Sequence, residues 1–382
     1  MLRRSNGSPR PRNYESLLTD DDNVPLSIRP KMTCSKKTPI DRISMLPDSL
    51  LTHILSFLPI EDAIKTDVLS KRWQYLWTTL PSLLFRLPYP DSVDTIREFV
   101  TFVDKTLVLC NSSKIKKFVV DFKYDSRFSS NVNLWTRFAT RNAAEELHLE
   151  FHTADNYLHE DVRFVLPQLL FTNSSFTELR FSLCTVMPKG VVCWKLLKKL
   201  SIGYVKLNDG VMGKILAGSP VLENLELYYF YGITRLHVVN AHLDDDFEWH
   251  QNISRRLLQS LVHVKNLTLG TWLLQKDTDI KESYFSDVRP RLFNFNGEHY
   301  WTSQKKTFNC LMMHLKIVKC AGLRWCYRGC LFSFVQFLLK NARVLQQMVI
   351  NVDCLPHKEL FQVAQKFLSF PRSSPNAVIM FN

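Results

Sequence analysis

The sequence has little glycine, no long apolar run and no apolar leader. Glycine accounts for 11 of 382 residues, which excludes glycine-rich low-complexity segments. No apolar run approaches the roughly 20 residues that a membrane helix needs. The opening stretch, MLRRSNGSPRPRNYE, carries charge but no apolar core, so it is unlike a secretory signal. We therefore expect a soluble intracellular chain, located in the nucleus, the cytoplasm or both.

The motifs of common catalytic sites are also absent. The chain has no G-x-S-x-G, no glycine-rich phosphate loop and no H-E-x-x-H. One stretch does combine histidines with acids, namely His148, His152 and His159 with Glu145, Glu146, Glu160 and Asp161. Because their spacing matches no metal or catalytic motif, we interpret these histidines as exposed loop residues. We predict that the protein is not an enzyme and needs no cofactor.

The nine cysteines form neither a disulfide framework nor a RING-type array. Their number is odd and their spacing irregular, which fits a reducing compartment. The densest group is Cys320, Cys326 and Cys330, with Cys310 and His314 upstream. A zinc site would favour two C-x2-4-C pairs, and no second pair is present. We expect these cysteines to be small buried hydrophobes rather than metal ligands.

The net charge of +13 raises nucleic acid or an acidic protein as a partner. Residues 1–40 hold eight Lys/Arg against four acids and few aromatics, which predicts a flexible basic arm. Its arginines at 3–4, 10 and 12 fit either a nuclear import signal or, as we favour, a solvated tail. The remaining basic clusters, at 114–118, 195–199 and 304–306, are scattered and accompany no nucleic-acid-binding motif. General surface basicity is therefore the favoured interpretation.

Three short amphipathic helical patterns lie within residues 46–80. The first has apolar residues at Leu50, Leu51, Ile54, Leu55 and Leu58 and ends at Pro59. The second spans 61–68, and the third begins at Ser70 with Trp73, Trp77 and Leu80 on one face. A unit this small buries too little apolar surface to be stable alone. Its spare apolar face should dock on the rest of the chain or on a partner, although an ordinary three-helix core with tryptophan filler fits the same pattern.

The segment closely resembles an F-box, in a form near that of plants. The resemblance lies in Leu46-Pro47, the ILSFLP run at 54–59, and LSKRW at 69–73 followed by Leu76-Trp77. It implies binding to the Skp-type adaptor of a cullin-RING ubiquitin ligase. The implied contacts are Leu46, Pro47, Leu50, Ile54, Leu55, Leu58, Leu69, Trp73 and Trp77. Some of these must instead belong to the domain's own core.

After Pro81 a short pattern, apolar-x-x-apolar-x-apolar, recurs eight times. The stations are Ile115/Phe118/Val120, Ala144/Leu147/Leu149, Phe176/Leu179/Phe181, Leu197/Leu200/Ile202, Leu222/Leu225/Leu227, Val264/Leu267/Leu269, Met312/Leu315/Ile317 and Leu345/Met348/Ile350. Two of the steps, 21 and 25 residues, fall in the leucine-rich-repeat range, and the others are longer. Each station predicts a short strand whose alternate side chains enter a core.

These stations resemble the repeats of plant F-box/leucine-rich-repeat proteins, especially at SSFTELRFSLC and GSPVLENLELYYFYG. The C-terminal FLLKNA, MVI and KFLSFPRSSPNA are similar to the FBD region that ends many such chains. There a helix, a Pro/Ser turn and a last apolar strand should cap the open edge of the solenoid. One departure is a region between Val239 and about Ile253, which is one or two repeats shorter than the family pattern.

We predict an α/β protein with a small N-terminal three-helix F-box, then an irregular leucine-rich-repeat horseshoe closed by an FBD-type segment. The expected boundaries are 1–40 for the arm, 41–85 for the F-box, 86–318 for the repeats and 319–382 for the FBD-like region. The resemblance implies a substrate-recognition adaptor of an SCF-type (Skp-cullin-F-box) ubiquitin ligase.

The concave strand face is the default surface for a target protein. Its candidate positions are Glu178, Arg180, Lys199, Ser201, Asn224 and Glu226. A second class of function is a non-degradative scaffold that binds the adaptor and uses its repeats for assembly. A third is a basic nucleic-acid binder, whose binding would fall steeply with salt. No residue pattern identifies a small-molecule pocket.

Overall fold

A computed structural model describes residues 43, 45–87, 89–90, 92–112, 114–153, 163–228, 261, 263–270, 301, 313–324, 328–353 and 357–381. The expected basic arm and the short region near 239–253 lie outside these residues. The chain divides into two units, Met1–Met45 and Leu46–Asn382, and every helix and strand below belongs to the second.

Helices and strands alternate through most of the described chain. The helices are α1 (Asp48–Leu55), α2 (Ile60–Lys65), η1 (Thr66–Val68), η2 (Leu76–Thr79), α3 (Val93–Leu109), η3 (Ser126–Phe128), α4 (Ser129–Arg141), α5 (Gln168–Thr172), α6 (Asp209–Gly218), α10 (Arg328–Asn341) and α11 (His357–Leu368). The strands are β1 (Ser82–Leu87), β2 (Lys117–Lys123), β3 (Glu146–His152), β4 (Phe164–Val165), β5 (Glu178–Ser182), β6 (Cys184–Thr185), β7 (Lys199–Gly203), β8 (Asn224–Tyr228), β9 (Asn266–Leu269), β10 (Ile317–Arg324), β11 (Gln347–Asp353) and β12 (Val378–Phe381). None of these helices combines the length and the hydropathy that a membrane crossing requires.

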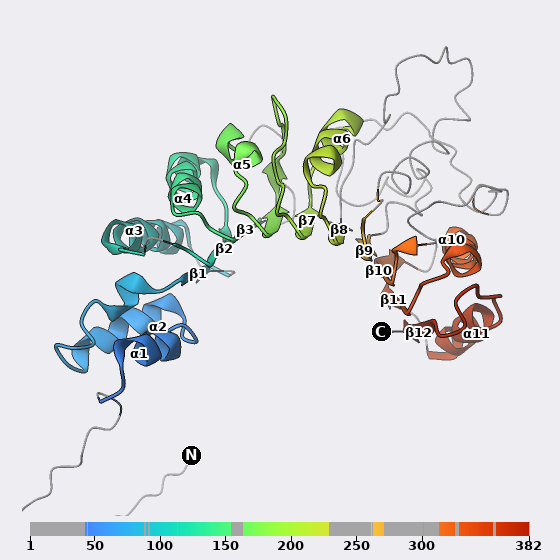
Figure 1. Ribbon diagram of the computed structural model, residues 1–382, viewed down its shortest axis with the longest axis horizontal. Helices are drawn as coiled ribbons and strands as arrows, with labels where there is room; N and C mark the ends of the chain where they lie inside the picture. The colour runs from blue at the N-terminus through green and yellow to red at the C-terminus, as the bar shows by residue number, and fades with distance from the viewer. Residues whose placement is uncertain are drawn as a thin grey trace, which may run out of the picture. The chain divides into compact units, whose positions relative to one another are not determined.

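Ten of the described strands form one parallel sheet in chain order, β1-β2-β3-β5-β7-β8-β9-β10-β11-β12. The short strands β4 and β6 pair separately. Helices α3 to α6 lie on one side of the row of strands (Figure 1). Strand β8 pairs directly with β9, with Leu225 opposite Leu267, so the ladder continues across the region that the sequence suggested was short of repeats.

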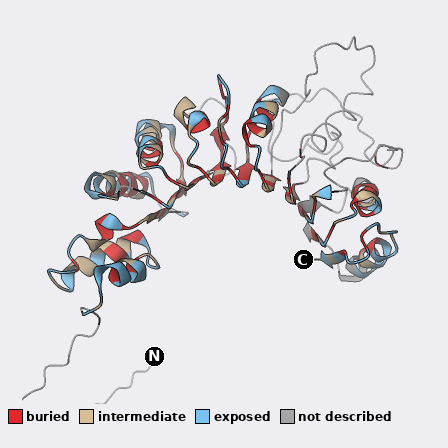
Figure 2. Cartoon of the chain, viewed as in Figure 1, coloured by how far each residue is buried: buried red, intermediate tan, exposed pale blue. Residues whose placement is uncertain are grey.

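The core follows the repeat pattern. The middle residue of each apolar triplet lies in a strand, opposite its counterpart in the next strand. These residues are at most 1% exposed and are Phe118, Leu147, Leu179, Leu200, Leu225 and Leu267. Buried residues run along the strands and onto the helices beside them (Figure 2). Full burial of a leucine is worth about 1.5–3 kcal/mol. Because these residues are buried against the adjacent repeats, each repeat is stabilised chiefly by its neighbours.

The seventh station is three residues further along than the sequence suggested. Leu315, Val318 and Cys320 are the buried residues, and Val318 pairs with Leu267. Ile317 is instead only half-buried, beside Asn266. The pattern was missed because a cysteine takes the third apolar position. Burial raises the pKa of the Cys320 thiol to about 12, as fits a small core hydrophobe.

The first two F-box helices are confirmed, but the expected third α-helix is wrong. Residues 71–75 form turns, and only the 3-10 helix η2 follows. Tyr75 has a left-handed backbone, with φ of 65°, which interrupts an α-helix. The Asp67 carboxylate holds this turn by accepting hydrogen bonds from the Tyr75 amide at 3.0 Å and the Trp77 indole at 3.2 Å. The turn still places Trp73 and Trp77 in the core.

Candidate functional site

Helix α1 divides its leucines and isoleucines between two surfaces. Leu51 and Leu55 are fully buried, whereas Leu50 is 48% and Ile54 is 42% exposed. The two exposed residues are four apart and so lie on the same face of the helix. The loop after α1 adds the exposed apolar residues Phe57 and Leu58, and the end of η1 adds Val68 and the adjoining Leu69. The small helical unit therefore uses one apolar face for its own core and leaves another open.

The nine residues implied by the F-box resemblance separate in the same way. Exposed positions are Pro47, Leu50, Ile54, Leu58 and Leu69. Leu46 is half-buried, while Leu55, Trp73 and Trp77 are buried within this chain. Their burial assigns the last three to the intramolecular core. Sequence periodicity missed Phe57 and Val68, which are 75% and 87% exposed, against 62% for Leu69.

An arginine from the turn after η1 fixes the start of α1. The Arg72 guanidinium donates to the Asp48 carboxylate at 2.8 Å and also to the Leu46 carbonyl. Both side chains are exposed, so the ion pair itself adds little stability. Its effect is to hold Leu46 and Pro47 beside the exposed face of α1.

The second candidate surface is the polar face of the strands. The six residues proposed for target binding fall into two rows across β5, β7 and β8. One row is Glu178, Lys199 and Asn224, and the other is Arg180, Ser201 and Glu226. Side chains in such rows are within reach of one another across the sheet. The structure thus brings all six together, with Glu178 and Ser201 buried and Lys199 exposed.

Glu178 is the centre of the charge pairing on this face. Its Oε1 accepts from Arg180 Nε at 2.9 Å, and Lys199 Nζ lies 3.1 Å from its Oε2. Burial alone would raise the pKa of the Glu178 carboxyl, but the hydrogen bonds from Arg180 and Lys199 outweigh it and lower the pKa to about 2. The carboxylate is therefore ionised at neutral pH and forms an ion pair between β5 and Lys199 of β7.

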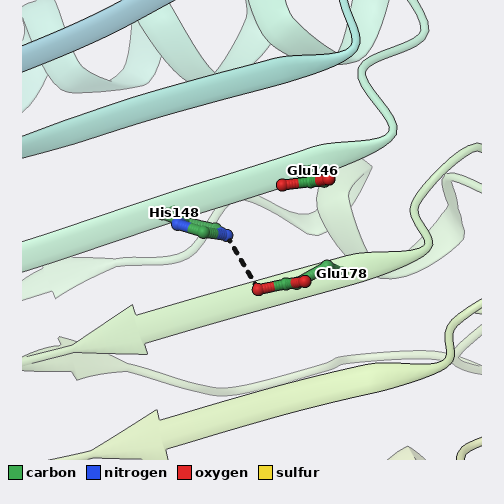
Figure 3. A group of neighbouring side chains, drawn as sticks. All are labelled: Glu146, His148 and Glu178. Atoms are coloured by element: carbon green, nitrogen blue, oxygen red, sulfur yellow. Dashed lines mark ion pairs between the residues drawn. The ribbon is translucent and has the colours of Figure 1, made fainter.

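His148 and His152 correct the prediction of loop histidines, because both lie on strand β3. His148 is only 5% exposed, with Nε2 3.2 Å from Oε1 of Glu178 (Figure 3). Burial, followed by the charge of Lys117, lowers the pKa of His148 to about 4, so its imidazole is neutral at pH 7. His159 lies outside the described residues. Alternation along the strand EELHLEFH was the available signal that these side chains leave the core for the sheet's polar face.

His152 makes a different contact, further along the same strand. Its Nε2 lies 2.6 Å from Oδ1 of Asp121 on β2. The hydrogen bond to Asp121 is the largest influence on the imidazole and raises the pKa of His152 despite its partial burial. Together with the bond from Ser201 Oγ to Glu226 at 2.9 Å, these contacts make the face a largely self-paired polar surface. It offers fixed hydrogen-bonding groups for recognition.

Three known protein domains match successive parts of the chain. Residues 43–85 match the F-box domain, 132–287 match the LRR repeats of FBD-associated F-box protein At5g56370, and 304–350 match the FBD. These three domains are typical of non-catalytic adaptor proteins.

Several similar curated proteins come from Arabidopsis thaliana. F-box/LRR-repeat protein At5g02910 is 40% identical over 192 residues, covering 50% of this chain and 39% of that protein. FBD-associated F-box protein At5g56370 is 37% identical over 193 residues, covering 49% and 43%. F-box/LRR-repeat protein 25 is 32% identical over 190 residues, covering 50% and 68%.

The matched part of the chain thus spans about two fifths of the first two of these relatives, and about two thirds of the third. Three observations point to the same family. They are the exposed apolar face beside a buried helical core, the parallel repeat sheet and these matches. The chain belongs to the F-box/LRR-repeat protein family, in the form that also carries an FBD.

Proposed function

We propose that this protein is the substrate-recognition adaptor of an SCF-type ubiquitin ligase. F-box domains generally bind Skp-type adaptors in cullin-RING ligases. The observation that carries the proposal is the open apolar face of α1, formed by Leu50 and Ile54, together with the exposed Leu58 and Leu69 of the same domain. An exposed apolar surface of this kind on a small helical domain is typical of a protein interface.

The repeat strands would hold the target. In this proposal they line the concave side of a horseshoe-shaped solenoid, which the FBD-type segment closes. The two polar rows across β5, β7 and β8 supply charged and hydrogen-bonding groups of both signs, which suits a protein surface better than a nucleic-acid backbone. The protein would act in the nucleus, the cytoplasm or both.

No bond-making step is assigned to this chain. A tethered target would be ubiquitinated because it is held near a conjugating enzyme that carries ubiquitin and is bound elsewhere in the assembly. The contribution of the chain is then a raised effective concentration of the acceptor lysine. A non-degradative scaffold would share the adaptor contact but present no target for ubiquitination.

The adaptor contact is tested by mixing the purified full chain with a purified Skp-type adaptor and measuring co-elution at low and high salt. We expect wild type to form a complex that survives high salt, because the interface is apolar. The variant Leu50→Glu/Ile54→Glu should form no complex. The matched control is Val108→Glu/Leu134→Glu, which places the same two charges at exposed apolar residues of α3 and α4. Co-elution of both variants with the adaptor would contradict the proposal, as would no complex from folded wild-type protein.

A further inference from the structure

Three side chains of the polar strand face converge on one point. Glu146 and His148 come from β3 and Glu178 from β5, as Figure 3 shows. One possible ligand atom from each residue lies within 4.8 Å of the other two. Strand register explains the grouping, because Glu146 pairs with Glu178 and His148 is two residues along on the same face.

His148 is the part of this group that its protein neighbours leave unsatisfied. Its Nε2 is buried and makes no hydrogen bond within the described chain. The atom lies 3.2 Å from Glu178 Oε1, but not in hydrogen-bonding orientation. Leaving such a group unpaired costs about 1–3 kcal/mol. A ligand that bridges Nε2 and the carboxylate would remove this cost.

We propose that Glu146, His148 and Glu178 form a binding site for a divalent transition metal ion, with zinc as the best fit. Imidazole nitrogen and carboxylate oxygen both bind zinc in proteins, and three protein ligands leave a fourth position for water. With metal–ligand bonds of about 2.1 Å, tetrahedral geometry separates ligand atoms by about 3.4 Å. The distance from His148 to Glu178 already fits, and the Glu146 carboxylate needs a side-chain movement on the order of 1 Å.

The other nitrogen of His148 supports this assignment. Nδ1 lies 3.7 Å from Oε1 of Glu150. A carboxylate in this position favours the tautomer with the proton on Nδ1, as is usual for metal-bound histidine. The Nε2 lone pair then faces a carboxylate oxygen, and a cation placed between these two acceptors would bind both.

Nearby cations set the strength of the site. Lys117 pairs with Glu146 at 2.8 Å, and Lys199 and Arg180 pair with Glu178. The lysine side chains are 32% and 56% exposed, so each can turn into water. Exchanging two ammonium groups for one divalent ion leaves the local charge unchanged. The lysines therefore compete with the metal, and removing them should tighten binding. The inference does not depend on the proposed ligase function.

The test uses the full chain, stripped of metal and kept reduced. Zinc bound at equilibrium is counted for wild type, His148→Gln, His152→Gln and Lys117→Gln/Lys199→Gln. Cysteines elsewhere add a background that all four proteins share. We expect His148→Gln to lose one equivalent. His152→Gln, altered on the same strand but outside the group, should keep it. The double lysine variant should bind that equivalent roughly tenfold more tightly, since two partly exposed ion pairs are lost.

Two further measurements guard against misfolding. Glu146→Gln changes a less buried ligand and should also lose the equivalent, and zinc should raise the unfolding temperature of wild type but not of either ligand variant. Equal zinc binding by wild type and both ligand variants would overturn the proposal. So would loss of the equivalent in His152→Gln to the same extent as in His148→Gln.

Discussion

The double variant Leu50→Ala/Ile54→Ala should weaken adaptor binding without unfolding the protein. The two side chains are 48% and 42% exposed, so a partner that covers them buries about half of each. Full burial of such a side chain is worth about 1.5–3 kcal/mol, which gives about 1.5–3 kcal/mol for the pair. The dissociation constant should therefore rise roughly 10- to 150-fold.

The assay pairs calorimetric titration of a Skp-type adaptor with urea unfolding of the same samples. The control is Leu51→Ala, in the same helix but fully buried, which should cost about 2–5 kcal/mol of stability through the cavity it leaves. The exposed pair should cost less than about 1 kcal/mol of stability. Wild-type affinity in the double variant would refute the assignment of this face to the adaptor.

Other predictions concern the strand face and are read from unfolding curves. Glu178→Gln should lower stability by about 1–2 kcal/mol at neutral pH, a figure discounted for the exposed partners Arg180 and Lys199. Because the folded pKa of Glu178 is depressed from 4.5 to about 2, wild type should lose this advantage as pH falls through that window, and a pH-independent difference would contradict it. The pKa of His152 is raised above 6.5, so His152→Gln should be most destabilising below pH 6.5 and less so as pH rises, and the opposite trend would exclude the Asp121 bond as the cause. Gly203→Ala would place a methyl 2.0 Å from the Tyr228 ring and should cost about 1–3 kcal/mol, whereas unchanged stability would show that the ring moves freely.

Periodicity located most of the sheet because each repeat must bury its apolar residues against the next. Leu179, Leu200 and Leu225 were found this way and line up in adjacent strands. The rule failed where the chemistry departs from large aliphatic residues, as at Cys320. It also failed at Tyr75, where a left-handed residue breaks a helix whose apolar spacing is intact. Spacing alone does not reveal such a backbone turn.

The polar residues were harder to predict than the core. His148 was predicted to lie in a loop because the spacing of the histidines was compared only with catalytic and metal motifs. The alternation of apolar and polar residues around His148, which indicates a strand, was not used. Its partner Glu178 is 30 residues away, and only the pairing of β3 with β5 brings them together. Likewise, periodicity gave the apolar face of α1 but not the division between buried Leu55 and exposed Ile54, which depends on where η2 packs against α1.

The most direct test of the central claim is capture of the tagged full chain from plant cells with the proteasome inhibited, for wild type and Leu50→Glu/Ile54→Glu. Skp-type adaptor, cullin and ubiquitin on the co-captured proteins are quantified together. We predict that wild type brings down adaptor and cullin, and that at least one protein bound by both forms is ubiquitinated only with wild type. Wild-type protein that is folded yet captures no adaptor, or targets ubiquitinated equally with both forms, would contradict it.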